Sequence, residues 1–135
     1  MRVLAIDLGD KRTGLAIGDE DTSMVMPVEV LEIPRGPRLL DAVKTAIETH
    51  GAERLVIGLP LNMDGTEGDR ARICRAFGKE LEDVSSLPIA FQDERLSSDE
   101  ANRRMARSGR THGEKKRLRD ALAACVVLED HFGQI

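Results

Sequence analysis

The stretch VLAIDLGDKRTGLAIGD, residues 3–19, decides the fold that we expect for this chain. It holds two short aliphatic runs, residues 3–7 and 14–18, which are joined by a glycine-containing connector of hairpin length. This pattern is typical of two adjacent antiparallel strands. The first strand ends in Asp7, and a carboxylate at that place adds nothing to a core. We therefore expect Asp7 to have a partner or a chemical task.

The rest of the chain predicts a third strand and then alternating helices and strands. Alternating apolar and acidic residues over 28–33 predict the strand, and helical spacing from Leu39 to Ile47 predicts a helix that ends at Gly51. Further along we expect a strand over 54–58, a helix carrying Ile73, Phe77 and Leu81, a strand over 89–93, a helix from Ser97 or Ser98, an exposed loop over 107–116 and a last helix over 116–132.

This order, βββαβαβαα, predicts the fold class. Three meandering strands followed by helix-linked parallel strands form a mixed five-stranded sheet flanked by helices, which is characteristic of the α/β ribonuclease H-like fold. The chain has 135 residues and neither a linker nor an internal repeat, so we expect a single domain over 1–135.

The charge of the chain is unevenly distributed. The net charge is -4, yet the segment 95–119 contains nine Lys or Arg against three Asp or Glu. Such a segment favours a polyanionic partner, although most charge runs are simply solvated helix faces. With three Phe and neither Trp nor Tyr, base stacking on aromatic side chains is not the main binding mode that we expect.

Composition also bears on location. No apolar run approaches the length of a membrane span, and the N-terminus lacks the pattern of a signal peptide, so we expect a cytoplasmic protein. Cys74 and Cys125 lie in helical patterns outside any CxxC pair, which predicts buried, reduced thiols.

Three carboxylates are candidates for catalysis. Asp7 ends the first strand, Glu94 follows the fifth, and Asp120 begins the apolar part of the last helix. Strand ends meet at one edge of such a sheet, and a helix packed across the sheet can bring a third acid to the same place. Mutual repulsion would raise the pKa values of these groups, and Mg²⁺ or Mn²⁺ would relieve it and could hydrolyse a phosphodiester.

Each acid also has a purely structural interpretation. Asp7 could cap its turn, Glu94 could pair with Arg95, and Asp120 could lie on a solvated helix face. The last alternative is the weakest, because residues 121–128 are apolar on every side.

Two loops favour a phosphate-bearing ligand. Lys11 and Arg12 lie between two glycines beside the first acid, in a loop that lacks the Walker A pattern. The segment GLPLNMDGTEG, residues 58–68, follows the fourth strand and leads into a helix, where backbone N–H groups can bind an anion. Its Asn62 is a candidate ligand for substrate, or a residue that only shapes the turn.

Four blocks of the sequence together resemble a known family. AIDLGDKRTGLAIGD, VIGLPLNMDGTEG, DERLSS and RDALAACVVLEDHF, in this order and spacing, are similar to the signature blocks of the YqgF family, also called RuvX. That family comprises proposed Holliday junction resolvases and proposed nucleases that mature the 5′ end of pre-16S ribosomal RNA. The resemblance covers essentially the whole chain. It implies that Asp7, Glu94 and Asp120 are the catalytic and metal-binding acids and that Arg12 and Arg95 flank them.

We therefore expect a metal-dependent nuclease that acts on precursor ribosomal RNA, with branched DNA as the alternative substrate and a monomer or homodimer as the assembly. Two other classes stay open: an actin-like or sugar-kinase ATPase, which resembles this chain in its first loop, and a non-catalytic ribosome-assembly factor. The residues expected to bind substrate are Lys11, Arg12, Asn62, Arg95, Arg110, Lys115 and Lys116.

Overall fold

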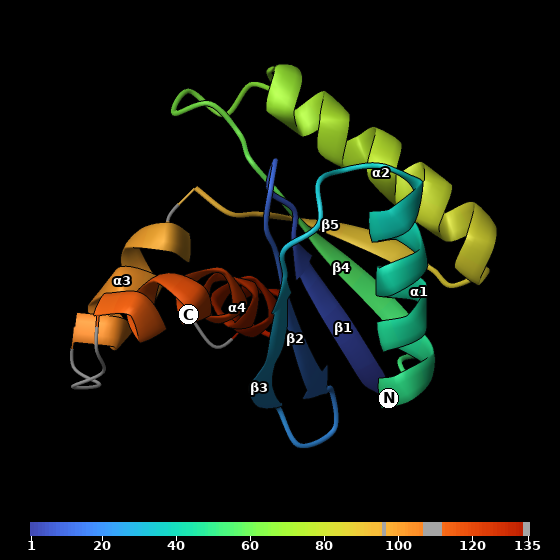
Figure 1. Cartoon of the computed structure of the whole chain (residues 1–135), viewed down its shortest axis with the longest axis horizontal. Coiled ribbons are helices and arrows are strands. Elements are labelled where there is room, and N and C mark those ends of the chain that lie inside the picture. Colours follow the sequence, from blue (N-terminus) through green and yellow to red (C-terminus); the bar gives the residue numbers. More distant parts are fainter. Residues whose placement is uncertain (96, 107–111, 134–135) are drawn as a thin grey trace.

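The computed structural model describes residues 1–95, 97–106 and 112–133, and at 97–99, 105 and 112–117 it describes the helical backbone (Figure 1). Its elements follow the order that the sequence predicts. They are β1 (Arg2–Asp7), β2 (Thr13–Asp19), β3 (Met24–Leu31), α1 (Pro37–His50), β4 (Arg54–Leu59), α2 (Asp69–Ser85), β5 (Ile89–Asp93), α3 (Ser97–Ala106) and α4 (His112–His131).

The strands form one five-stranded sheet in the order β3-β2-β1-β4-β5. β1 and β2 are antiparallel, with Asp7 opposite Gly14, and β3 pairs antiparallel with β2. β1 and β4 are parallel, as are β4 and β5, because α1 and α2 return the chain to the same end of the sheet. This mixed sheet with flanking helices confirms the predicted ribonuclease H-like class.

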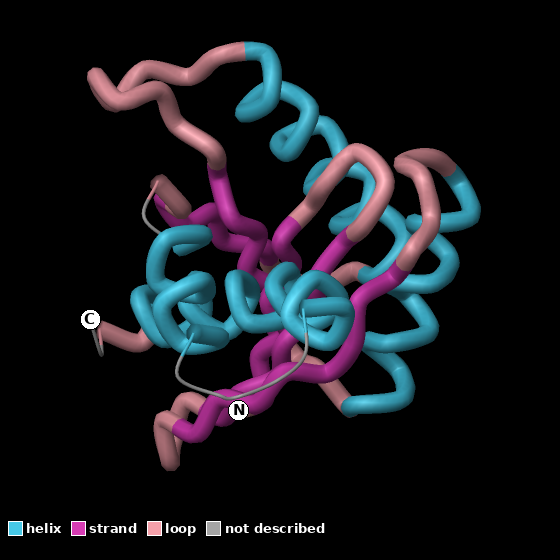
Figure 2. Tube along the Cα trace, turned by 60° about the vertical axis from the view of Figure 1, so that its left-hand side comes forward, coloured by secondary structure: helices cyan, strands magenta, loops and turns pink. Residues whose placement is uncertain are grey.

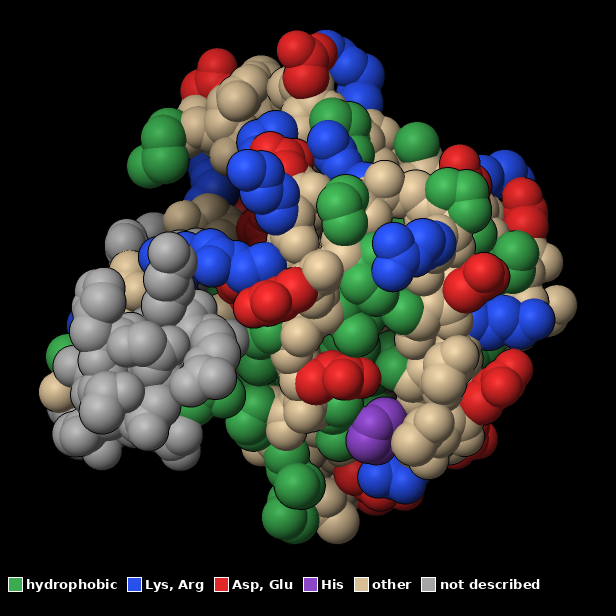
Figure 3. All heavy atoms as spheres, viewed as in Figure 1, with side chains coloured by type: hydrophobic (Ala, Val, Ile, Leu, Met, Phe, Trp, Pro, Cys, Tyr) green, Lys and Arg blue, Asp and Glu red, His purple; other side chains and the backbone are tan. Residues whose placement is uncertain are grey.

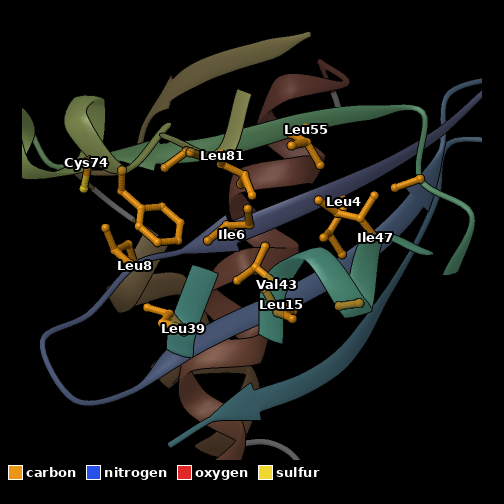
Figure 4. Close-up of a cluster of buried hydrophobic side chains, with 14 of the residues drawn as sticks. Leu4, Ile6, Leu8, Leu15, Leu39, Val43, Ile47, Leu55, Cys74 and Leu81 are labelled. Carbon is orange, nitrogen blue, oxygen red and sulfur yellow. The ribbon is translucent and has the colours of Figure 1, made fainter. Parts of the chain in front are cut away.

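Helices cover both faces of the sheet. α1 and α2 lie on one face, and α4 crosses the other with α3 packed beside it (Figures 1 and 2). Because side chains alternate along a strand, each central strand contributes to two cores. In β1, Leu4 and Ile6 join the cluster under α1 and α2 (Figure 4), whereas Val3 and Ala5 pack under α4.

The predicted end of α1 is confirmed. Gly51 follows the helix with φ 65° and ψ 36°, a left-handed conformation that glycine adopts without a steric penalty. The buried stripe of the helix consists of Leu39, Val43, Ala46 and Ile47, at the spacing that the sequence predicts.

Two predicted boundaries are wrong. The third strand spans 24–31 instead of 28–33, because backbone pairing with β2 extends it over residues whose side chains show no alternation. It tolerates Pro27 because it is an edge strand. The last helix begins at His112 instead of Lys116, so the second half of the expected loop is helical. Residues 114–119, EKKRLR, are all good helix formers, so helix propensity favours a helix that already includes the end of the expected loop.

The cysteine prediction is confirmed. Cys74 and Cys125 are both buried and free of any disulfide, and burial raises the pKa of each thiol to about 12. Within the described ranges, no helix combines the length and the apolar character that crossing a membrane requires.

Candidate active site

The candidate site lies at the edge of the sheet where the three parallel strands end. Residues Val3 and Ala5 of β1, Val56 of β4 and Ala90 of β5 all face α4. Every second side chain along a strand points to the same face of the sheet. By this rule the residues that face α4 at the ends of the three strands are Asp7 in β1, Gly58 in β4 and Glu94 just after β5. Strand alternation alone therefore brings Asp7 and Glu94 together, although 86 residues separate them in the sequence.

Asp120 reaches this edge because α4 touches β2 at a glycine. A Cβ atom on Gly14 would lie 1.9 Å from the backbone oxygen of Asp120, so only glycine allows the helix to approach this closely. Gly14 is the register partner of Asp7. The contact therefore fixes the start of the apolar part of α4 beside the first acid.

A second glycine makes room for Glu94. A Cβ atom on Gly58 would lie 2.3 Å from Oε2 of Glu94 and 3.2 Å from Cγ2 of Val127. The carboxylate thus occupies space above β4 that any larger residue at position 58 would fill. Glu94 itself is held at the strand end by a backbone hydrogen bond of 3.2 Å from its N–H to the oxygen of Leu59.

The three acids line one cavity of about 350 Å³. Arg12, Arg70 and Arg95 line it as well, together with the glycine and apolar residues of the neighbouring loops. Figure 3 shows this region as a recess in the surface, with acidic side chains inside and Lys or Arg side chains at its rim. The structure thus brings together the three acids and two of the cations that the sequence singles out.

Burial of two neighbouring carboxyl groups perturbs their protonation. Burial raises the pKa of Asp7, and it raises the pKa of Glu94 to about 9, with the charge of Asp7 as the second cause. A hydrogen bond joins the two side chains. It partly offsets the raised pKa of Asp7, and it raises the pKa of Glu94 further. Without a bound cation, burial and mutual repulsion therefore favour a pair of carboxyl groups that shares one proton.

Two arginines near the acids are engaged in this conformation. Nε of Arg12 lies 3.3 Å from Oδ2 of Asp120, a half-buried ion pair. Arg95 binds both carboxylate oxygens of Asp93 and donates a hydrogen bond of 3.2 Å to the backbone oxygen of Met63. Arg95 thereby ties the end of β5 to the loop that follows β4.

Arg70 is the residue of this cavity that the sequence analysis missed. Its positive charge opposes the rise in the pKa of both Asp7 and Glu94. Nη1 of Arg70 lies 3.7 Å from Asp10, and the same carboxylate lies 3.1 Å from Nη2 of Arg35. A cation in the first turn of α2 opposes the helix dipole, and this unfavourable placement is the signal that could have identified it.

The remaining predicted substrate ligands are placed as follows. Lys11 is exposed and lines a wide groove of about 820 Å³ that borders Arg12 and Asp120. Asn62 donates a hydrogen bond of 2.9 Å to Oγ1 of Thr66, so its side chain shapes the loop, as the alternative interpretation holds. Arg110 and the side chains of Lys115 and Lys116 lie outside the described part of the chain.

The basic segment is partly neutralised within the protein. Arg103 pairs with Glu100, and Arg104 binds both Glu100 and Glu129, which joins α3 to α4. The excess of positive charge over 95–119 is therefore not wholly available to a ligand.

The acids fit a hard divalent cation in their chemistry. All three donors are carboxylates, and Oδ2 of Asp120 is buried with the Arg12 guanidinium as its charged neighbour. In this conformation, no three His, Cys, Asp or Glu side chains of the described residues stand together as a metal-binding group. In the same conformation, Arg12 pairs with Oδ2 of Asp120, and a hydrogen bond joins the carboxyl groups of Asp7 and Glu94.

The sheet order and the acid-lined edge define a ribonuclease H-like domain with a candidate phosphodiester-cleaving site. A family model described as RuvX, Holliday junction resolvase, matches residues 1–134, and the chain belongs to this family. A proposed pre-16S rRNA nuclease of Anaeromyxobacter sp. (strain K) is 40% identical over 129 residues, covering 96% of this chain and 94% of the relative. A protein of Streptococcus pneumoniae (strain Hungary19A-6) with the same description is 34% identical over 135 residues, covering 98% and 97%.

Solved structures share the fold at low sequence identity. Thermus thermophilus RuvC in complex with a Holliday junction substrate is 13% identical, with a TM-score of 0.59 over 98% of this chain and 94% of that one. The fowlpox virus Holliday junction resolvase is 10% identical, with a TM-score of 0.62 over all of both chains. These likenesses confirm the architecture.

Proposed function

We propose that this protein is a metal-dependent nuclease that hydrolyses phosphodiester bonds in precursor 16S ribosomal RNA during maturation of its 5′ end. One observation carries the proposal: three carboxylates from distant parts of the sequence and three arginines line a single cavity. The relatives described as pre-16S rRNA nucleases support the choice of substrate. Membership of RuvX over nearly the whole chain favours this class over an ATPase.

In this proposal Asp7, Glu94 and Asp120 hold Mg²⁺ or Mn²⁺. When bound there, the cation would lower the pKa of a water molecule and offset the charge of the phosphate. Asp7 and Glu94 give up the proton that they share when the cation binds. Arg12 leaves Asp120 and, with Arg70, donates hydrogen bonds to phosphate oxygens at the rim of the cavity.

The test compares wild type with Asp7→Asn on end-labelled pre-16S leader RNA in Mg²⁺, Mn²⁺ or EDTA. We expect cleavage that requires the metal and falls by at least about 100-fold in the variant, with RNA binding retained. Val84→Ala, an exposed change at the far end of α2, serves as the control and should cleave normally. Equal RNA binding by both proteins without any cleavage would instead establish a non-catalytic assembly factor.

Cleavage of branched DNA is the second candidate, and the description of the family model favours it. A four-way DNA junction assayed beside the RNA separates the two functions. Paired symmetric nicks in the junction, with the RNA left intact, would assign a resolvase. Such nicks would also require a homodimer, because a single site cuts one strand at a time.

A further inference from the structure

A second cavity of about 290 Å³ lies beside the candidate active site. Of the described residues, Met63, Asp93, Arg95 and Asp130 line it. Arg95 lines both cavities, so the two are neighbours. A volume just below the usual range of small-molecule pockets suits one planar group of the size of a nucleobase.

Met63 supplies an apolar surface at this cavity. It is 82% exposed, the most exposed large apolar side chain of the described residues, although a solvated position normally favours a polar residue. The hydrogen bond from Arg95 to its backbone oxygen fixes the loop that carries it. A thioether makes favourable contacts with aromatic rings, so Met63 can act where the chain has neither Trp nor Tyr.

Asp130 supplies a hydrogen-bond acceptor. Gln92 donates a hydrogen bond of 3.0 Å to Oδ2 of Asp130, which orients the carboxylate from the neighbouring strand. Among the described residues, no donor binds its Oδ1. The other carboxylate of the cavity, Asp93, has both oxygens bound by Arg95. Asp130 is thus the acceptor that remains for a ligand.

We propose that this cavity binds one unpaired guanine of the RNA substrate, next to the phosphate that is cleaved. Guanine presents two N–H donors side by side on its Watson–Crick edge. One can donate to the open Oδ1 of Asp130 and the other to Oδ2, which has a second lone pair beside the hydrogen bond from Gln92, whereas uracil places a single donor between two acceptors. The ring stacks on Met63, and the edge faces Asp130. This inference deepens the proposed function and rests on it.

Binding of short RNAs tests the inference separately from cleavage. The probe is a fluorescently labelled pentauridylate whose central base is uracil, guanine, adenine, cytosine or absent, measured by anisotropy in Mg²⁺ with Asp7→Asn protein. We expect the guanine probe to bind about 10-fold more tightly than the abasic one, because stacking and one base-edge contact together supply such a factor.

Three further variants, each made in Asp7→Asn protein, assign the effect to its residues. In the Met63→Ala variant, the probes that carry a base should bind only slightly more tightly than the abasic probe. Asp130→Asn should remove the preference for guanine over uracil. Met26→Ala is the matched control, because Met26 is 54% exposed on β3, the edge strand at the opposite side of the sheet. It should bind every probe as the parent does.

The outcomes separate the two proposals. Equal binding of the abasic and guanine probes, unchanged by Met63→Ala, overturns the base site and leaves the nuclease proposal intact. Equal affinity for all four bases overturns the role of Asp130. Failure of every probe to bind, together with failure of the longer leader RNA, overturns the nucleic-acid function itself.

Discussion

The protonated pair of Asp7 and Glu94 shows how single residues set the chemistry of this site. Strand alternation directs both groups to one face, and burial there disfavours two negative charges. The pair therefore retains a proton at neutral pH, which a divalent cation would displace. The site is thus expected to bind metal more tightly as the pH rises.

The raised pKa of Glu94 predicts how stability depends on pH without metal. Between about pH 5 and pH 9 the folded protein holds a proton that the unfolded chain has released, so the free energy of unfolding should fall as the pH rises. At about 1.4 kcal/mol per pKa unit, the shift of Glu94 corresponds to a loss of up to about 5 kcal/mol over this range. Urea denaturation in EDTA at pH 5, 7 and 9 measures it.

The matched variant is Glu94→Gln, which resembles the protonated side chain and should lose most of this dependence. If the free energy of unfolding of the wild type instead rises from pH 5 to pH 9, compared with that of Glu94→Gln, the raised pKa of Glu94 is contradicted.

Gly58 provides a test of the position of the Glu94 carboxylate. Gly58→Ala places a methyl group where Oε2 of Glu94 now lies, and the flexible side chain must move away. Because a flexible group yields, we expect a stability change within about 1 kcal/mol. Cleavage should fall by about 100-fold, since a displacement of about 1 Å can have that effect.

Gly78→Ala is the control for this change. It crowds Phe91 and Ile57 on the face under α2, away from the acids. It should reduce stability by about 1 to 3 kcal/mol and leave the activity of the folded protein intact. Full activity of Gly58→Ala would show that the carboxylate need not occupy this space.

At the scale of elements, the docking of α4 on β2 decides whether a site exists. Gly14→Ala would drive a Cβ atom into the helix backbone at Asp120, and a backbone cannot rotate away as a side chain can. We expect a loss of about 3 kcal/mol or more, measured by thermal or urea unfolding. A stable Gly14→Ala protein with normal cleavage would refute this account of the glycine.

The elements themselves were largely predictable, because their apolar spacing and end signals are local. α1 ends at Gly51 and β5 spans 89–93, as the sequence predicts. The errors fall where side-chain alternation is absent or where a dense run of charge masks helix propensity. β3 owes its length to pairing with β2, and the start of α4 depends on helix propensity within a segment rich in charge.

At the scale of the whole molecule, positive charges around the cavity and groove predict binding that depends strongly on salt. Lys11 is exposed on this groove, so Lys11→Gln should remove about one phosphate contact. The slope of log affinity against log salt should become shallower by about 0.7 for a single strand. Titrations of leader RNA from low to moderate salt, with catalytically inactive Asp7→Asn protein, provide the measurement.

Lys79→Gln is the control, because Lys79 lies in the C-terminal half of α2 beside Asp83, 4.0 Å away. Its slope should match that of the parent protein. An unchanged slope for Lys11→Gln would remove Lys11 from the binding surface.

The sequence by itself predicted the order of the elements, the ribonuclease H-like class and the meeting of three acids at one edge of the sheet, because strand alternation, glycine positions and charge can be read from the local order of residues. Only the tertiary structure decided that Arg70 joins these acids, that Asn62 turns inward to its own loop and that Arg104 pairs with Glu129 of α4. These facts depend on distances between residues far apart in the chain or on the path of a loop, and helix or strand periodicity specifies neither.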